Sequence, residues 1–244
     1  MTTILVTGGT GTLGRLVTER LRGAGHEVRV LSRHSEPYAV DLREGGPALD
    51  RAVTGVDVIV HCASTQTGGD EKAAAHLVAA ARRAEVPHLV YISIVGVDEV
   101  PFPYYKAKLA VERLVEESGL GWTVLRATQF HDLVAAAVRV AAKLPVVFLP
   151  AGVADQPIEV AEVADRLAEL AVLPPAGRVA DMGGPEVLTF AELARTYLGA
   201  VGKRRPVVSV RLAGAAYRAF RGGGHLAPER RVGKVTFAEY LSRP

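Results

Sequence analysis

The 244-residue chain has one cysteine, Cys62, and this scarcity excludes a disulfide framework. Cys62 ends the apolar run that begins at Val58, so we expect a buried thiol and not a nucleophile. The chain lacks a run of about 18 apolar residues, which excludes a membrane-spanning helix. Met1 leads straight into an apolar segment without the charged start of a secretory signal, and we therefore expect a cytoplasmic protein.

A strong excess of charge of either sign is also missing. The 29 Lys and Arg and the 26 Asp and Glu give a net charge of +3, which does not by itself favour a nucleic-acid partner. The histidines lack the clustered spacing of a zinc site. We expect a globular monomer or homodimer with no metal, no nucleic-acid partner and no membrane partner.

Glycines at the N-terminus form the most informative pattern that is present. Gly8, Gly9, Gly11 and Gly14 follow an apolar strand at 3–7 and open a helical pattern. This order allows a tight turn, a close approach of the backbone to a pyrophosphate, and close packing of helix on strand. The free N–H groups at the helix start then hold the anion. We interpret the segment as a nucleotide-phosphate site and not as an ordinary turn.

The first half of the chain alternates strands and helices. Continuous Val, Ile and Leu runs predict strands that are buried on both faces of a parallel sheet. The predicted strands are 3–7, 27–32, 56–62, 88–93 and 122–126, and the predicted helices are 12–23, 70–85 and 104–117. The sequence thus predicts an α/β fold, a Rossmann-type doubly wound parallel sheet with a small C-terminal substrate lobe. Only about five residues separate the second strand from 38–41, too few for a crossover, so we expect a strand stub or an irregular connection there.

The pattern changes after about residue 127. Helices are predicted at 134–144, 160–170 and 189–199, with strand and loop at 145–157 and a further strand at 207–210. Thr189 and Glu192 have the spacing of a capping box. We assign residues 1–130 to a nucleotide-binding core and 131–244 to a substrate lobe that packs on it as a single structural unit. A helix-turn-helix interpretation of 189–205 is disfavoured because no second recognition helix follows.

The end of the second strand indicates the type of dinucleotide. An acidic residue there would bind the ribose hydroxyls of NAD, whereas Ser32 and Arg33 suit the extra phosphate of NADP. Arg15 adds a second positive charge beside the glycine loop. Asp41 and Leu42 are predicted to lie near the adenine, although Asp41 is nearly as well explained as an ordinary loop aspartate.

A second group of residues, Ser93, Tyr104 and Lys108, suggests catalysis. Ser93 ends the strand 88–93, where side chains point toward a ligand. Tyr104 and Lys108 are four residues apart, hence on one helical face. A nearby ammonium favours the phenolate of a tyrosine, and a serine can bind the substrate oxygen. An aromatic side chain at a helix start often only packs, and this alternative stays open for Tyr104.

Three segments together resemble the short-chain dehydrogenase/reductase superfamily, and more narrowly its atypical NmrA-like NAD(P)H-binding branch. These segments are Thr7-Gly8-Gly9-Thr10-Gly11-Thr12-Leu13-Gly14, Tyr91-Ile92-Ser93-Ile94-Val95-Gly96-Val97-Asp98 and Tyr104-Tyr105-Lys106-Ala107-Lys108. Residues 118–130 are similar to the strand and loop that follow in that branch. The chain departs from the pattern in a shortened region after the second strand and in Arg126-Ala127-Thr128, where extended members have Arg-Pro-Gly.

The resemblance implies bound NADP(H) and a small apolar or aromatic substrate. It places Lys108 at the nicotinamide ribose, Arg33 on the 2′-phosphate, and Gln129 and Phe130 around the nicotinamide, where they would face the substrate together with Val95. The implied cofactor contacts are Gly8, Thr10, Gly11, Thr12, Leu13, Gly14, Arg15, Ser32, Arg33, Asp41, Leu42, Cys62, Ala63, Ser64, Lys108 and Thr128.

Two functions are consistent with the resemblance, which covers both enzymes and redox sensors. The first is an NADPH-dependent oxidoreductase that transfers hydride to a carbonyl or quinone, with Ser93, Tyr104 and Lys108 as catalytic residues. The second is a non-catalytic NADP(H)-sensing regulator. Sugar-nucleotide epimerase or dehydratase chemistry is a third interpretation, which requires tightly held NAD and which Arg33 argues against.

Overall fold

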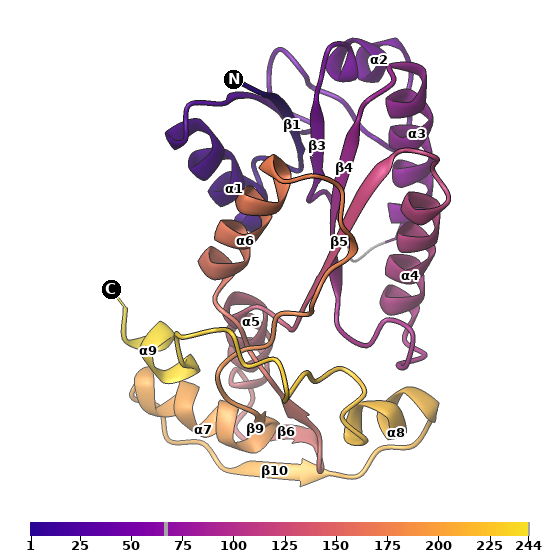
Figure 1. The fold of residues 1–244 in the computed structure, drawn as a ribbon. Coiled ribbons are helices and arrows are strands. Elements are labelled where there is room, and N and C mark those ends of the chain that lie inside the picture. Colours follow the sequence, from indigo (N-terminus) through magenta and orange to yellow (C-terminus); the bar gives the residue numbers. More distant parts are fainter. Residues whose placement is uncertain (66–67, 244) are drawn as a thin grey trace. The chain divides into compact units, whose positions relative to one another are not determined.

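The computed structural model describes residues 1–65 and 68–243, and the chain divides into two units. The first unit comprises Met1–Ser93, Pro103–Leu125 and Val163–Val179, and the second comprises Ile94–Phe102, Arg126–Glu162 and the chain from Ala180 onward. Figure 1 gives the order of the elements along the chain.

The first unit contains most of a six-stranded sheet with the order β2-β1-β3-β4-β5-β8. β1 pairs in parallel with both β2 and β3, so the direction of strand order reverses between β1 and β3. Ligands of doubly wound folds bind at the carboxyl ends of the strands at this reversal. The strands are β1 (Thr3–Thr7), β2 (Glu27–Leu31), β3 (Val58–His61), β4 (His88–Ile94), β5 (Gly121–Ala127) and β8 (Gly177–Arg178).

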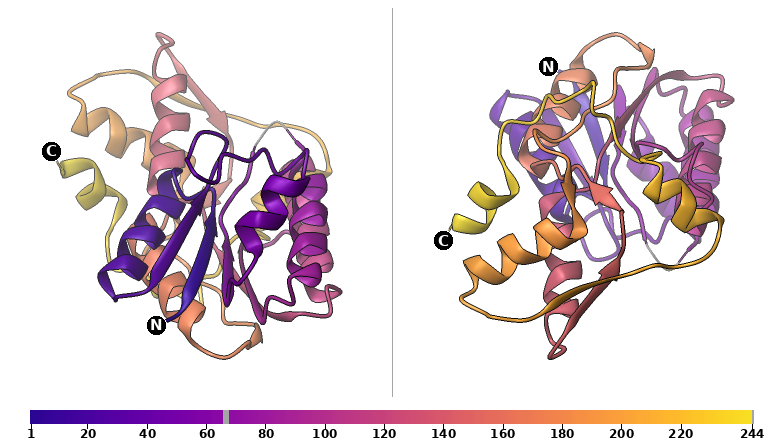
Figure 2. Two further views of the ribbon diagram at one scale, coloured as in Figure 1. Left: turned by 90° about the horizontal axis from the view of Figure 1, so that it is seen from above. Right: turned by 90° about the horizontal axis from the view of Figure 1, so that it is seen from below.

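Helices cover the sheet of this unit. α2, α3 and α4 pack side by side, and their buried residues form one core with the strands, centred on Leu5, Ile59, Leu77 and Leu89. On α1, Arg20 pairs with Asp165 of α6 at 2.7 Å. Figure 2 shows the sheet between these two sets of helices. The helices are α1 (Thr12–Gly23), α2 (Pro47–Val53), α3 (Asp70–Arg83), α4 (Pro103–Glu116) and α6 (Val160–Val172).

The predicted α/β fold with a parallel sheet is confirmed, and differences occur where the sequence pattern is irregular. Residues 38–41 form the expected stub in an irregular connection, with one bridge that joins Ser32 to Ala39, but the crossover to β3 also contains α2, which the sequence did not predict. The helix predicted at 134–144 begins three residues earlier, as α5 (His131–Ala141). Phe130 is its extended N-cap, and the His131 N–H is held by the Ile158 carbonyl, a contact that the local sequence does not reveal.

The second unit has its own core. A two-stranded parallel sheet of β6 (Val147–Pro150) and β10 (Val207–Val210) packs on α5 and α7 (Phe190–Ala200). Thr189 caps α7 with the predicted capping box, in which Glu192 also accepts from the Thr189 N–H. The remaining elements are β7 (Ala154–Asp155), β9 (Leu188–Thr189), α8 (Ala215–Arg221) and α9 (Phe237–Ser242). In residues 1–65 and 68–243, no helix combines the length and the apolar content that a bilayer crossing requires.

Candidate functional site

The glycine loop between β1 and α1 has a backbone that side chains would obstruct. Gly8 has φ +64°, and a Cβ there would lie 2.8 Å from the Cα of Ala63. A Cβ on Gly9 would lie 2.8 Å from Val30 Cγ1, and one on Gly14 would collide with the carbonyl oxygen of Gly8. The glycines therefore let the turn, the neighbouring strands and the helix start approach one another closely.

The start of α1 leaves hydrogen-bond donors for a ligand. The first intrahelical bond runs from the Arg15 N–H to the Gly11 carbonyl, so the amides of residues 12–14 precede the helical ladder. Gly11 is the N-cap and supplies no side-chain acceptor, and the first turn has no acidic residue. Thr10, Gly11 and Thr12 are exposed, whereas Leu13 and Gly14 are buried. This cradle fits the pyrophosphate of a dinucleotide.

The end of β2 presents a mixed set of charges. Arg33 is exposed and forms no ion pair with a described residue, and its charge helps to lower the pKa of Asp41. The larger cause is Arg43, which binds the Asp41 carboxylate through Nη2 at 2.6 Å.

The other predicted contacts of this region have partners of their own. Ser32 Oγ lies 2.7 Å from Ser35 Oγ. Leu42 is buried in the core of the first unit. Arg15 is exposed and pairs with Glu19 at 2.6 Å.

Tyr104 and Lys108 on α4 belong to one chain of polar contacts. The Ser64 hydroxyl donates to Asp70 Oδ2 at 2.6 Å, which leaves its oxygen to accept from the Tyr104 hydroxyl at 2.9 Å. Asp70 also accepts from the Thr65 N–H at 2.8 Å. Lys108 Nζ lies 3.9 Å from Asp70 Oδ2, and both side chains are buried. The Tyr104 hydroxyl is thus part of a polar network, which packing alone would not require.

Burial controls the titration of this network. Burial lowers the pKa of Lys108, while the carboxylate of Asp70 opposes that shift. Burial raises the pKa of Tyr104, the hydrogen bond with Ser64 opposes the shift, and Asp70 adds to it. The sequence suggested that Lys108 would favour the phenolate, but in the structure the ammonium lies beside Asp70 and the tyrosine stays protonated at neutral pH.

Two hydroxyls on β4 are buried and unsatisfied. Ser93 Oγ and Tyr91 Oη have no hydrogen-bond partner among the described residues. Ser93 is 3% exposed, and Lys108 Nζ lies 5.2 Å from the Tyr91 ring centroid. Buried polar atoms nearly always have a hydrogen-bond partner. A buried hydroxyl without one, at the carboxyl end of a strand, therefore fits a site where the oxygen of a bound ligand supplies the missing partner.

His61, Cys62 and Ala63, at the end of β3 and directly after it, have structural surroundings. Cys62 is half-buried and not fully buried as the sequence suggested, and burial raises the pKa of its thiol to about 12, so the thiol stays protonated. His61 pairs through Nδ1 with the Thr7 hydroxyl at 2.7 Å, and burial lowers its pKa to about 3. Ala63 is half-buried directly above Gly8. These residues form one wall beside the glycine loop.

Four predicted contacts belong to the second unit. Thr128 is buried, and its hydroxyl donates to the Gln156 carbonyl at 2.5 Å and accepts from the Gly184 N–H at 3.2 Å. Val95 is buried and donates its N–H to the Ala127 carbonyl. Gln129 and Phe130 are half-buried. Their predicted cofactor and substrate contacts stay predictions.

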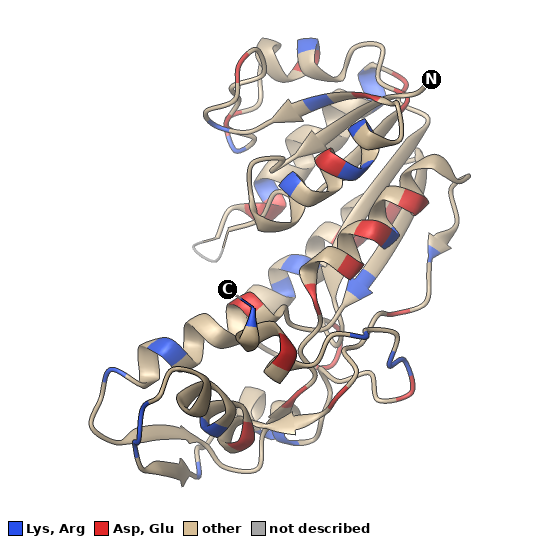
Figure 3. Ribbon diagram, turned by 90° about the vertical axis from the view of Figure 1, so that its left-hand side faces the viewer, with Lys and Arg blue, Asp and Glu red and all other residues tan. Residues whose placement is uncertain are grey.

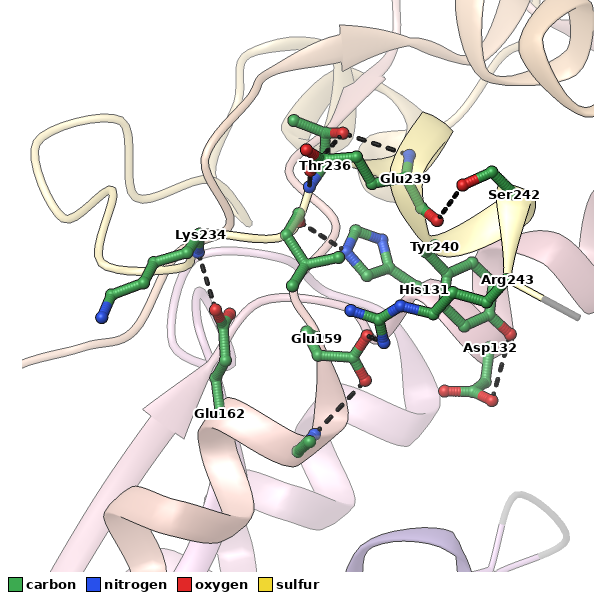
Figure 4. Close-up of polar contacts among 12 residues, drawn as sticks. His131, Asp132, Glu159, Glu162, Lys234, Thr236, Glu239, Tyr240, Ser242 and Arg243 are labelled. Atoms are coloured by element: carbon green, nitrogen blue, oxygen red, sulfur yellow. Dashed lines mark hydrogen bonds and ion pairs between the residues drawn. The ribbon is translucent and has the colours of Figure 1, made fainter.

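His131 and Asp132, two neighbouring titratable residues in the first turn of α5, have separate structural partners (Figure 4). His131 Nε2 lies 3.0 Å from the Val235 carbonyl, and its ring stacks on that of Tyr240. Asp132 accepts from the Tyr240 hydroxyl at 3.2 Å. Both residues thus hold α9 and the segment before it against α5. The nearby ion pair of Arg243 with Glu159, at 2.7 Å, adds to this attachment.

Sequence reasoning missed Asp70 and Tyr91. Asp70 opens α3 six residues after Ser64, and an acidic residue in a first turn is easily explained by the helix dipole alone. Its contact with Lys108 joins residues 38 positions apart in the sequence, and no local pattern indicates that contact. Tyr91 lies two residues before Ser93 on β4, and that period-2 spacing was the available signal.

Comparison with known proteins places this geometry in a family. A family model described as NAD(P)H-binding matches residues 8–172, more than half of the chain. A (4-alkanoyl-5-oxo-2,5-dihydrofuran-3-yl)methyl phosphate reductase of Streptomyces griseus is 35% identical over 204 residues, which cover 78% of this chain and 70% of that protein. A Mycobacterium tuberculosis protein of uncharacterised function is 33% identical over 223 residues. That match covers 85% of this chain, which spans only 24% of the length of the mycobacterial protein.

Among solved structures, an Escherichia coli NADPH-dependent quinone oxidoreductase complexed with NADPH has a similar fold. The TM-score is 0.82 and the identity is 20%, with 98% of each chain covered. At this identity the likeness concerns the fold. The glycine cradle at the strand-order reversal, the free first-turn amides and the family match lead to one conclusion: the chain belongs to the NAD(P)H-binding family.

Proposed function

We propose that this protein is an NADPH-dependent oxidoreductase that transfers a hydride to a small apolar or aromatic carbonyl or quinone. The proposal includes membership of the NmrA-like branch of the short-chain dehydrogenase/reductase superfamily. Support comes from a relative that is named as a reductase and from a structural neighbour that is an NADPH-dependent quinone oxidoreductase.

The observation that carries the proposal is that the first unit holds two hydroxyls of different character. Ser93 Oγ is buried and has no partner among the described residues, whereas the Tyr104 hydroxyl is held by Ser64 and is half-buried. The first can donate to a substrate oxygen without breaking an existing bond. The second holds a proton that a reduced oxygen requires.

The roles of the side chains follow from these positions. NADPH, when bound, supplies the hydride. Ser93 orients the acceptor oxygen by a hydrogen bond, and Tyr104 gives its hydroxyl proton to that oxygen. A raised pKa keeps Tyr104 protonated, which suits an acid in the direction of reduction. Asp70 acts as a positioning residue, because it orients Ser64 and balances the charge of Lys108. A quinone needs less from Tyr104, since solvent can protonate the hydroquinone.

The preference for NADPH rests on Arg33. Its guanidinium is exposed and forms no ion pair within the described part of the chain, and it lies at the end of β2, where a 2′-phosphate would lie. Asp41 is held by Arg43 and is therefore a weaker competitor for the Arg33 charge. Titration of NADPH against NADH tests this assignment, and a clear preference for NADH would overturn it.

The catalytic roles are tested with a ketone substrate. Tyr104→Phe removes the proton donor and is expected to lower kcat by about 100-fold while NADPH affinity is retained. Tyr197→Phe, which removes a half-buried hydroxyl on α7 of the second unit, is the matched control. Full NADPH oxidation in both Tyr104→Phe and Lys108→Ala would refute the tyrosine–lysine mechanism.

A second candidate is a non-catalytic sensor of NADP(H). The specific observation in its favour is that the proton of the Tyr104 hydroxyl is already engaged with Ser64, which is itself held by Asp70. Tight NADPH binding together with failure to reduce any member of a panel of ketones and quinones would favour this candidate.

A further inference from the structure

The outer face of the two-stranded sheet in the second unit is apolar and exposed. Val147 and Leu149 of β6 point into the core with α5 and α7, so Phe148, between them, points outward. Phe148 is paired in register with Val208 of β10, and Val210 lies two residues farther on the same side. Phe148 is 56% exposed, Val208 41% and Val210 39%.

Two more exposed apolar side chains lie at the two ends of the sheet. Leu144 lies three residues before β6 and is 52% exposed, and Leu212 lies two residues after β10 and is 54% exposed. Since β6 and β10 are parallel, Leu144 lies at the end of the sheet where β10 begins. Large apolar side chains gathered on one surface indicate an interaction site more often than isolated ones do.

Basic residues flank these apolar residues along the chain. Lys203, Arg204 and Arg205 lead directly into β10, and Arg211 follows it. Lys143 precedes Leu144 at the same end of the sheet as the run 203–205. All five are exposed, and none forms an ion pair with a described residue. We call these five cations, with Leu144, Phe148, Val208, Val210 and Leu212, the basic-apolar face.

Acidic residues are absent from the segments that build this face. The sequence contains no Asp or Glu between Asp132 and Asp155, and none between Glu192 and Glu229. Figure 3 shows where the basic and acidic residues lie along the ribbon. The chain as a whole has a net charge of only +3, so the positive charge is local to these segments and calls for a negatively charged partner.

We propose that the basic-apolar face binds the surface of an anionic lipid bilayer. Exposed aliphatic side chains can enter the boundary between headgroups and acyl chains, while Lys and Arg beside them attract anionic headgroups. This attachment is peripheral, and it revises the expectation from sequence that no membrane partner exists. It is independent of the proposed reaction.

The charge and apolar character of the basic-apolar face disfavour two other partners, a second copy of the chain and a nucleic acid. A second copy of the chain would bring its own five cations against these five, and like charges repel. A nucleic acid would satisfy the cations, but it would leave Leu144, Val210 and Leu212 without an apolar environment, because bases stack on aromatic and not on aliphatic side chains. An anionic bilayer offers negative headgroups to the five cations and an apolar environment to the exposed apolar side chains.

The test is flotation of the full-length protein with vesicles at about 0.1 M salt, near physiological screening. Binding is expected to vesicles that contain phosphatidylglycerol in phosphatidylcholine and not to pure phosphatidylcholine. The double substitution Arg204→Glu and Arg205→Glu should weaken binding by about 30-fold or more. The matched control, Arg51→Glu with Arg82→Glu, makes the same change of charge at exposed sites of the first unit and should bind as the unsubstituted protein does.

A second variant tests the apolar half. Phe148→Ser with Val208→Ser retains every charge and should bind anionic vesicles at least about fivefold less tightly. Equal binding to neutral and anionic vesicles, or unchanged binding of either face variant, would overturn the proposal. Tighter binding to duplex DNA than to vesicles, insensitive to Phe148→Ser, would assign the face to nucleic acid instead. Dimerisation in sedimentation experiments that Phe148→Ser abolishes would assign it to a second copy.

Discussion

Replacing Asp70 with asparagine tests the charge balance beside Tyr104 in a single substitution. Lys108 Nζ lies 3.9 Å from the Asp70 carboxylate, and the two residues are 4% and 6% exposed. At this separation, and with an effective dielectric constant near 20, the attraction is about 4 kcal/mol. Asparagine keeps an oxygen for the Thr65 N–H, but an amide group in place of Oδ2 removes both the acceptor of the Ser64 hydroxyl and the charge beside the buried ammonium.

The expected result at pH 7 is a decrease in unfolding free energy of about 3 kcal/mol, because a buried charge without its partner is costly. The difference should depend on pH. The folded-state pKa of Lys108 is below its ordinary value because of burial, and removal of Asp70 lowers it further. A lysine with a depressed folded pKa releases its proton on folding, so stability rises as pH increases toward the unfolded pKa. In Asp70→Asn the unfolding free energy begins to rise at a lower pH than in the unsubstituted protein. The difference in unfolding free energy between the two proteins should therefore narrow as pH approaches 10.

The assay is urea unfolding followed by circular dichroism at pH 7 and at about pH 10. Glu71→Gln is the matched control, since Glu71 is the exposed neighbour in the same first turn of α3 and its loss should cost no more than about 1 kcal/mol. Three results would refute the reasoning: an Asp70→Asn variant as stable as the unsubstituted protein at pH 7, a deficit that is unchanged at pH 10, or an equal deficit in Glu71→Gln.

Three further predictions concern other positions. Gly14→Ala should abolish NADPH binding in a fluorescence titration, because its Cβ collides with the Gly8 carbonyl; Gly23→Ala on the same helix meets no atom within 4 Å and should bind normally. Burial raises the pKa of Asp155 to about 7, so its contribution to stability is present below about pH 4 and is lost as pH rises to about 7. Asp155→Asn should therefore stabilise the protein at pH 8 by up to about 4 kcal/mol in urea unfolding and have little effect near pH 4; equal effects at both values would contradict this. Arg33→Ala should weaken NADPH binding by at least about tenfold and leave NADH binding unchanged, and a parallel loss for both cofactors would argue against a phosphate contact.

Local patterns predicted much of the fold because they depend on residues close in sequence. The strand β1 and the helix α1 have the predicted bounds, since glycine spacing and apolar periodicity are properties of short segments. The capping box of Thr189 and Glu192 was likewise readable, because both halves of the motif lie within four residues. The helix α2, in the connection after β2, could not be predicted from the sequence, because it is short and its position depends on the core that it joins.

In the candidate site, too, the features set by local sequence differ from those set by long-range contacts. The sequence by itself determined the glycine cradle, the Ser93 position at a strand end and the shared helical face of Tyr104 and Lys108, because each follows from a backbone period. Only the tertiary structure decided that Asp70 is the partner of Lys108 and that Tyr104 is kept protonated, since burial and long-range pairing set a pKa. The basic-apolar face also needed the tertiary structure, because it appears only when β6 and β10, about 60 residues apart, pair in register and turn their outer sides to solvent.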